Sequence, residues 1–265
     1  MIVSTINVNG IRAAVKERSE DNTGLLPWLR DTRADVVCLQ ETRADDAQLR
    51  VALAPALESG WHLASAEPHL KGRNGVAVLA RTPITDVQIG LDDEFASHGR
   101  YVQVQTGGIT VASVYVPTGE AETDKQREKE RFMAALADRM SRLRHLDSGA
   151  VICGDWNIAH TENDIKAWRN NVKKSGFLPS ERQWLSELLG AGWSDVVRGL
   201  HPGRPGPYSW WSWRGKAFDN DAGWRIDYHL ANAALASRAS AAQVERAPAY
   251  ALRWSDHAPV TVEFD

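Results

Sequence analysis

The stretch Ala150-Val151-Ile152-Cys153-Gly154-Asp155-Trp156-Asn157 decides how the rest of the chain is interpreted. Its first four residues are small or apolar and predict a buried strand, which Gly154 ends. Asp155 and Asn157 follow two residues apart, and in extended backbone residues at that spacing point to the same face. A carboxylate beside an amide suits a pair in which one group takes a proton from water and the other holds that water. Because Asp and Asn also cap and turn after ordinary strands, the octet needs support from the rest of the chain.

Length and composition define the broad class of protein. A chain of 265 residues can bury a sizeable core, and 43% hydrophobic with 25% charged residues is typical of a globular protein. No linker-like shift in composition and no internal repeat divides it, so we expect a single domain over residues 1–265. No basic region followed by an apolar stretch opens the chain, and no run approaches the ~20 apolar residues of a membrane span. We therefore expect a cytoplasmic protein without membrane contact.

Apolar runs like the central one recur along the chain. We expect strands at residues 1–6, 35–41, 75–80, 101–105, 109–116, 224–230 and 258–264, and helices at 25–29, 45–57, about 125–146 and from 180 onward. The charged run KQREKER at residues 125–131 is expected to be a solvated helix face rather than a DNA-binding patch. Cys38 and Cys153 lie inside apolar runs and are expected to be buried free thiols. Strands that are apolar on both faces, with helical patterns between them, indicate an α/β domain in which helices cover the sheets.

Polar side chains end five of the expected strands, and another polar group precedes the last strand. They are Asn7 and Asn9, Glu41, Tyr115, Asp155 with Asn157, Asp227, and the group Ser255-Asp256-His257. Each has a plainer explanation as a turn residue, a helix cap, a core tyrosine or a structural histidine. Asp227 is the hardest to explain in that way, because a buried carboxylate needs a partner. One shared pocket explains all six groups better than six separate coincidences.

These stretches resemble the exonuclease III type of apurinic/apyrimidinic (AP) endonuclease, within the endonuclease/exonuclease/phosphatase superfamily. The motifs occur in family order along nearly the whole chain: TINVNGIRA (5–13), LQETR (39–43), GVAVLAR (75–81), YVPTGE (115–120), GDWNIAH (154–160), GFLPSERQWL (176–185), YSWWSW (208–213), GWRIDY (223–228) and SDHAPV (255–260). The resemblance implies a four-layered α/β sandwich, in which two mixed β-sheets pack face to face and are flanked by helices. It also implies a metal-dependent phosphodiesterase that cuts duplex DNA 5′ to abasic sites, with 3′–5′ exonuclease and 3′-phosphodiesterase activity.

The resemblance assigns a metal role to four residues. Glu41 would be the principal Mg²⁺ ligand, helped by Asn7 and Asn9, with Asp256 near the metal. Mg²⁺ prefers oxygen ligands and keeps several waters, so one carboxylate plus amides is an adequate site, and Mn²⁺ is expected to substitute. Some relatives carry Asp where this chain has Asn9, which makes this site less anionic.

The resemblance assigns the chemistry to five other residues. Asp155 would orient and deprotonate the attacking water beside Asn157, Tyr115 and His257 would contact the scissile phosphate, and Asp227 would pair with His257. Protonated donors and a hard cation are needed because the incoming oxygen meets an anionic diester. A Ser-His-Asp hydrolase is excluded as a rival, since the adjacent residues 255–257 cannot form that relay and no nucleophile elbow is present.

Four basic residues are candidates for contact with the DNA backbone: Arg43, Arg73, Lys174 and Arg214. By resemblance, Arg73 and the loop around Arg214 would enter the minor groove and help bend the duplex, although each residue alone is equally explained as a solvated charge. The net charge of −3 does not itself indicate nucleic-acid binding, but the carboxylates of a metal site offset basic residues elsewhere in the total.

Eleven tryptophans are unusual for this length. The resemblance implies that Trp210, Trp224 and Ile226 wall an apolar pocket for a flipped-out abasic deoxyribose, with core packing as the plainer alternative. The expected partner is duplex DNA with abasic sites or blocked 3′ ends, bound by a monomer. Two other functions stay open. The same catalytic core could act on another phosphoester, such as RNA, a nucleotide or a phosphoinositide. A non-catalytic DNA-binding module would require a missing catalytic residue, and none is missing.

Overall fold

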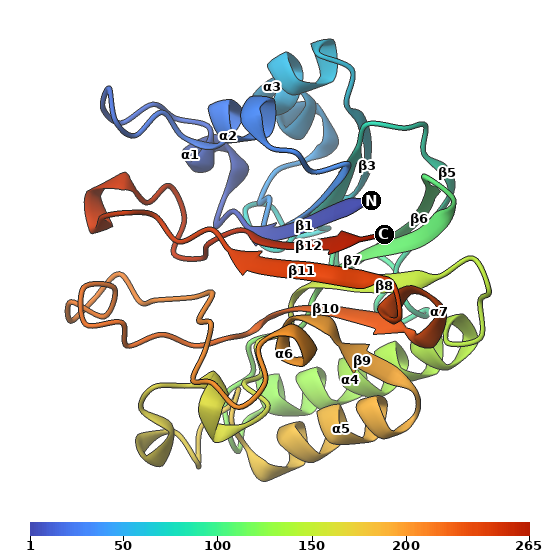
Figure 1. Ribbon diagram of the computed structural model, residues 1–265, viewed down its shortest axis with the longest axis vertical. Coiled ribbons are helices and arrows are strands. Elements are labelled where there is room, and N and C mark those ends of the chain that lie inside the picture. The colour runs from blue at the N-terminus through green and yellow to red at the C-terminus, as the bar shows by residue number, and fades with distance from the viewer.

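Two six-stranded β-sheets pack face to face in the computed structural model, which describes all of residues 1–265, and helices cover both outer faces (Figure 1). The first sheet has the strand order β11-β12-β1-β2-β4-β3, and the second has the order β5-β6-β7-β8-β10-β9. Both sheets are mixed, because β1 and β2 pair in parallel, as do β7 and β8, whereas the other pairs are antiparallel. The predicted four-layered α/β sandwich is confirmed.

The strands are β1 Ile2–Asn7, β2 Val36–Gln40, β3 His62–Ala66, β4 Val76–Ala80, β5 Thr85–Ile89, β6 Tyr101–Thr106, β7 Ile109–Tyr115, β8 Ala150–Asp155, β9 Trp193–Asp195, β10 Asp227–Asn232, β11 Ala239–Val244 and β12 Val260–Phe264. The helices are α1 Ile11–Ala14, α2 Leu25–Asp31, α3 Asp46–Glu58, α4 Asp124–Leu143, α5 Pro179–Gly190, α6 Val196–Leu200 and α7 Ala233–Ala236, with 3₁₀ turns η1 Glu162–Asp164, η2 Trp168–Asn170 and η3 Tyr250–Leu252. None of these helices is long and apolar enough to span a bilayer.

Three apolar clusters join the four layers. The cluster between the sheets takes side chains from both of them, including Cys38 and Cys153, which are buried free thiols as predicted. Helices α1 to α3 cover the first sheet, and α4 with α5 cover the second (Figure 1). Along α4 the residues Phe132, Leu136 and Met140 are buried at four-residue spacing, which is the amphipathic pattern of a helix on a sheet.

The structure differs from the sequence-based expectations at several ends and edges. The long helix ends at Leu143 rather than near residue 146, and the strand expected from residue 224 begins at Asp227. Trp224 pairs instead with Trp210 and Ile165 in isolated bridges outside the sheet. Strands β3, β5, β9 and β11 were not expected. They are short or exposed, and β5 is exposed at all five positions, so they lack the apolar run that marks an inner strand.

The two sheets bring the polar strand ends to one edge of the molecule. Tyr115 and Asp227 both lie in register with Asp155, on the two strands that flank β8. In the other sheet Asn7 lies in register with Gln40, the residue before Glu41. The carboxyl ends of β1, β2, β7 and β8 therefore meet the amino end of β10 at this edge.

Candidate active site

A pocket of about 270 Å³ opens at this edge of the sandwich. Most of the predicted site residues line it: Asn9, Glu41, Arg43, Tyr115, Asp155, Asn157, Trp210, Trp224, Ile226, Asp256 and His257. Thr118, Ser175 and Gly176 complete the lining and were not predicted. Asn7 and Asp227 are fully buried directly behind the pocket, and Arg73, Lys174 and Arg214 lie outside it.

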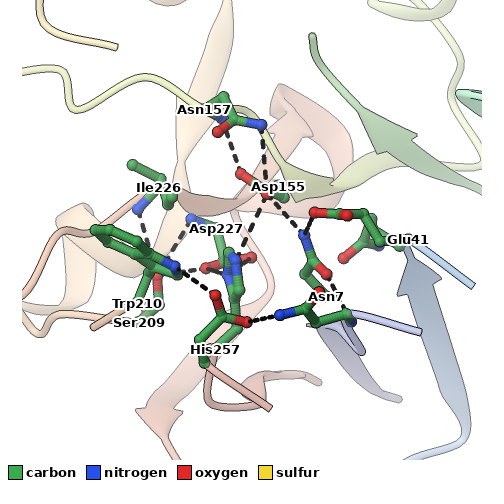
Figure 2. A network of polar contacts seen from close by, with 12 residues as sticks. Asn7, Glu41, Asp155, Asn157, Ser209, Trp210, Ile226, Asp227 and His257 are labelled. Atoms are coloured by element: carbon green, nitrogen blue, oxygen red, sulfur yellow. Dashed lines mark hydrogen bonds and ion pairs between the residues drawn. The ribbon is translucent and has the colours of Figure 1, made fainter. Parts of the chain in front are cut away.

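Asp155 is the central carboxylate of the pocket (Figure 2). It is 2% exposed, and its Oδ2 accepts a hydrogen bond from Asn7 Nδ2 at 2.9 Å, while Oδ1 accepts one from the backbone N–H of Asn157 at 2.9 Å. Asn157 has a left-handed backbone, with φ of 51°, and its amide nitrogen donates to the backbone oxygen of Val116 at 2.9 Å. Burial raises the pKa of Asp155, and neighbouring His257 opposes that rise. A buried carboxylate held by donors and raised in pKa is suited to accept a proton.

His257 stands between two carboxylates. Its Nδ1 lies 2.9 Å from Asp227 Oδ2, and its Nε2 lies 3.7 Å from Asp155 Oδ2. Burial alone would lower the pKa of His257, but the charges of Asp227 and Asp155 outweigh it and raise the pKa to about 10. The imidazole is therefore cationic at neutral pH and can donate to a phosphate oxygen. Ser209, which was not predicted, donates to Asp227 Oδ2 at 2.5 Å and holds the carboxylate in place.

Tyr115 presents a neutral phenol to the pocket. Burial, together with the nearby carboxylates of Glu41 and Asp155, raises its pKa above the usual value for tyrosine. The guanidinium of Arg100 lies over the Tyr115 ring at 4.9 Å and donates to the Tyr115 backbone oxygen at 3.2 Å. The phenol can therefore act as a hydrogen-bond donor rather than as a phenolate.

Oxygen donors for a metal ion gather on the other side of Asp155. The Glu41 side chain is 15% exposed. Asn9 donates through Nδ2 to Asp256 Oδ1 at 2.8 Å, which leaves its side-chain oxygen Oδ1 available. No group of three or more His, Cys, Asp or Glu side chains is arranged as a metal cage. The donor chemistry nevertheless fits Mg²⁺, which is bound by one or two carboxylates and retains water.

Asn7, a predicted metal ligand, is hydrogen-bonded through both polar atoms of its side-chain amide. Its amide nitrogen donates to Glu41 Oε1 at 2.8 Å and to Asp155 Oδ2 at 2.9 Å, and its amide oxygen accepts the backbone N–H of Asn9 at 2.9 Å. Both polar atoms are thus engaged, and the side chain is fully buried. Asn7 therefore spaces the two carboxylates in this structure, and its role at the metal ion stays a prediction.

The opposite wall of the pocket is apolar. The rings of Trp210 and Trp224 meet edge to face with centroids 6.1 Å apart, and Ile226 is 5% exposed beside them. Trp210 also donates from Nε1 to Asp256 Oδ2 at 3.1 Å, so the apolar wall is fixed to the polar side (Figure 2). The pocket therefore presents an apolar surface and a charged, hydrogen-bonding surface to one ligand.

The four predicted DNA contacts fall into two groups. Arg43 lines the pocket and pairs with Glu41. Arg73, Lys174 and Arg214 are exposed on three separate loops, and none of them pairs with a carboxylate in the structure. Free cations on loops at the pocket are available for phosphate contact.

One expectation about the charged run at residues 125–131 is wrong. Gln126 and Lys129 of that run are buried, and the Lys129 ammonium pairs with Glu181 at 2.8 Å with neither side chain exposed. The other charges of the run follow the predicted solvated pattern. Gln126 and Lys129 differ from the other residues of the run only in their position on the helix. They lie on the inward-packing face of α4, together with Met133 and Met140.

Known proteins with this architecture share its whole length. The model of the endonuclease/exonuclease/phosphatase family matches residues 4–257. An exodeoxyribonuclease of Bacillus subtilis is 33% identical over 96% of this chain and 95% of its own length. An AP endonuclease structure from Archaeoglobus fulgidus has a TM-score of 0.89 at 29% identity, covering 100% of this chain and 99% of that one. A 3′ phosphatase from Neisseria, bound to a product DNA hairpin, has a TM-score of 0.87 at 32% identity, covering 100% and 99%.

The chain therefore belongs to the endonuclease/exonuclease/phosphatase family of phosphoester hydrolases. Nucleases of this family generally depend on a divalent metal ion, which agrees with the oxygen donors of the pocket. Its relatives and structural neighbours further identify it as a hydrolytic nuclease of the DNA-repair type.

Proposed function

We propose that this nuclease hydrolyses the DNA backbone 5′ to an abasic site in duplex DNA, with Mg²⁺ as its metal ion. The observation that carries the proposal is the two-sided pocket. Its apolar wall of Trp210, Trp224 and Ile226 faces the same 270 Å³ space as Asp155 and His257. A deoxyribose without a base is small and largely apolar, and extruding it costs less than extruding a paired base. Such a pocket selects the lesion without reading sequence.

The chemistry follows from the placement of the polar residues. Asp155 is positioned to accept the proton of the attacking water, while Asn7 and Asn157 fix the orientation of its two oxygens. The cationic His257 and the neutral phenol of Tyr115 donate hydrogen bonds to the phosphate oxygens as charge accumulates on them. Both donors are oriented in advance, the imidazole by Asp227 and the tyrosine backbone by Arg100.

The metal site is assigned to Glu41, Asn9 and Asp256. When bound there, Mg²⁺ would neutralise part of the negative charge on the phosphate diester. Glu41 pairs with Arg43 in the structure, so a metal ion held by Glu41 would compete with that ion pair.

Trimming of 3′ ends is a second activity of the same pocket. A terminal nucleotide would place its phosphate where the abasic phosphate is proposed to lie, and the Neisseria 3′ phosphatase, whose structure has product DNA bound, is similar to this chain over its whole length. We propose abasic incision as the main reaction because the apolar wall suits a sugar without its base. We also propose that the enzyme acts as a monomer in the cytoplasm, which sedimentation and cell fractionation would test.

The decisive experiment maps the cut. Two end-labelled 30-mer duplexes, one with a single tetrahydrofuran abasic analogue and one intact, are incubated with Mg²⁺ or with EDTA. The proposal predicts one Mg²⁺-dependent cut immediately 5′ to the analogue. Laddering of both duplexes from the 3′ end, without an internal cut, would make the enzyme chiefly an exonuclease. Cleavage of neither duplex would favour another phosphoester as substrate.

A further inference from the structure

A fully buried ion pair lies directly behind the pocket and has no part in the mechanism above. Lys129 of α4 and Glu181 of α5 meet at 2.8 Å, and both side chains are 0% exposed. The two helices cover the outer face of the second sheet. The side chains of Lys129 and Glu181 point toward the loops that follow β7 and β8. Removing two charges from water is costly, and an apolar pair of similar size often serves stability equally well. Stability alone therefore does not explain why Lys129 and Glu181 are charged.

The hydrogen bonds of Lys129 lead to the pocket wall. Its ammonium donates to the backbone oxygen of Asn157 at 2.9 Å, to that of Thr118 at 3.3 Å and to Ser175 Oγ at 3.4 Å. All three acceptors belong to residues that line the pocket. A single cation thus joins the segment that follows β7 to two segments of the connection between β8 and α5.

Glu181 completes the arrangement from the other side. Its Oε2 accepts the backbone N–H of Gly176 at 2.7 Å and that of Leu178 at 3.0 Å, and its Oε1 accepts from Ser175 Oγ at 3.0 Å. Ser175 Oγ also lies 2.7 Å from the Thr118 backbone oxygen. The carboxylate fixes the turn that presents Ser175 and Gly176 to the pocket.

Asn157 connects this arrangement to the proton acceptor. Its backbone oxygen is held by Lys129, and its backbone N–H is donated to Asp155 Oδ1. The left-handed backbone of Asn157 is uncommon for residues other than glycine, although asparagine adopts it more readily than most. A charged donor on its carbonyl is suited to hold that conformation, and thereby the direction of the Asp155 carboxylate.

We propose that Lys129 and Glu181 are positioning residues of this nuclease, which fix the wall formed by Thr118, Asn157 and Ser175–Gly176 and so align Asp155 for catalysis. The inference rests on the pocket being the site of DNA hydrolysis. Neither side chain reaches the pocket. Of the predicted DNA contacts only Lys174 adjoins the Ser175–Gly176 turn, whereas Arg43, Arg73 and Arg214 lie on other segments. Loss of the pair should therefore lower kcat while leaving KM and duplex affinity unchanged.

The test uses the double variant Lys129→Met/Glu181→Gln, which removes both charges together and leaves no lone buried ion. The expected result is a kcat lower by about 10- to 100-fold, the size of effect that small misplacements of catalytic groups produce, with KM and the Kd for duplex within about twofold of wild type. Met133→Ala on the same helix is the matched control, since it removes core packing from α4 but no hydrogen bond to a pocket loop. It should keep the wild-type kcat per folded molecule at a similarly lowered Tm.

A double variant with the wild-type kcat per folded molecule overturns the proposal, as does a loss no larger than that of Met133→Ala at equal Tm. If the double variant does not fold, Ser175→Ala decides, because it removes the link between Glu181 and Thr118 without burying a charge. About a threefold or greater loss of kcat at unchanged KM is expected from it, and an unchanged kcat contradicts the proposal. The kcat values of all variants are measured on the substrate that the wild type cuts, whether an abasic duplex or a 3′ end. A failure of the abasic-site proposal is thereby distinguished from a failure of the positioning proposal.

Discussion

Asp227 lies behind His257 with its Oδ2 2.9 Å from the imidazole Nδ1, and the carboxylate itself has no exposure to solvent. This contact keeps the imidazole cationic and turns its Nε2 toward Asp155 and the pocket. The orientation and charge of one catalytic donor thus depend on a residue that no substrate touches.

Asp227→Asn tests this dependence. The amide has the shape of the carboxylate but lacks the negative charge that stabilises the buried His257 imidazolium. His257 then loses positive charge and becomes a weaker hydrogen-bond donor to the phosphate. We expect kcat to fall by about 100-fold while duplex affinity stays near that of wild type. Steady-state kinetics and a binding titration measure both quantities. A wild-type kcat would show that the charge of His257 has no part in the reaction.

Asp155→Asn removes the proposed proton acceptor. We expect kcat to fall by about 1,000-fold or more, and duplex binding to be equal or slightly tighter, because a negative charge near the phosphate is lost. Asn157→Ala is the companion variant. It leaves the base in place, so about a tenfold loss is expected. Equal losses in the two variants would argue against Asp155 as the base.

Glu41→Gln tests the metal site. Replacing the partly buried carboxylate of Glu41 by an amide removes the principal charge that attracts a divalent cation, so the Mg²⁺ concentration for half-maximal rate should rise about tenfold or more. EDTA should abolish the wild-type activity. An unchanged Mg²⁺ requirement would place the metal ion away from Glu41.

Gly176 is predicted to be essential for the shape of the pocket. Its φ is +90°, and an added Cβ would lie 3.0 Å from the Asn157 backbone oxygen and 3.1 Å from Trp224 Cζ3. Gly176→Ala should therefore lower kcat/KM on the abasic analogue by about tenfold. Gly60→Ala is the control, because Gly60 has a φ of +101° and nothing within 4 Å of an added Cβ. Similar losses of activity in both variants would point to backbone strain rather than to the pocket.

Stability at low pH should depend on Asp164. Burial alone would raise its pKa, but Arg225 and Arg198 outweigh burial and lower it to about 2 from 3.8. A carboxyl pKa that is lower in the folded than in the unfolded protein stabilises the fold at every pH above the pKa of the unfolded state. This contribution of about 2 kcal/mol is lost as the pH falls from about 4 to 2. Urea unfolding of wild type and Asp164→Asn from pH 5 to 2.5 should give free energies of unfolding that converge toward the acid end. Parallel curves would contradict the assignment.

The sequence was informative wherever the fold uses apolar runs. The inner strands, the amphipathic α4 and the polar strand ends at Asn7, Glu41, Tyr115 and Asp155 are local patterns, so an α/β domain with one shared polar pocket could be predicted from them. The four-layered sandwich and the roles of the pocket residues were implied by the resemblance to exonuclease III type enzymes. The edge strand β5 could not, because its five exposed residues carry no burial pattern.

Contacts between distant segments were beyond sequence reasoning. Lys129 looks like any charge in KQREKER until α5 brings Glu181 against it, and Ser209 gains its role only when Asp227 lies beside it. The orientation of the Asn7 amide likewise depends on two carboxylates from different strands. Such residues become recognisable only once the packing is known.

The central claim is that this pocket is built for an abasic sugar. The most direct measurement mixes a tetrahydrofuran-containing duplex and an intact duplex, labelled differently, with excess enzyme and Mg²⁺ in one tube and follows a single turnover of each. We predict that incision 5′ to the analogue is at least about 100-fold faster than loss of the 3′-terminal nucleotide from either duplex. Equal rates, or faster trimming of the 3′ ends, would contradict it.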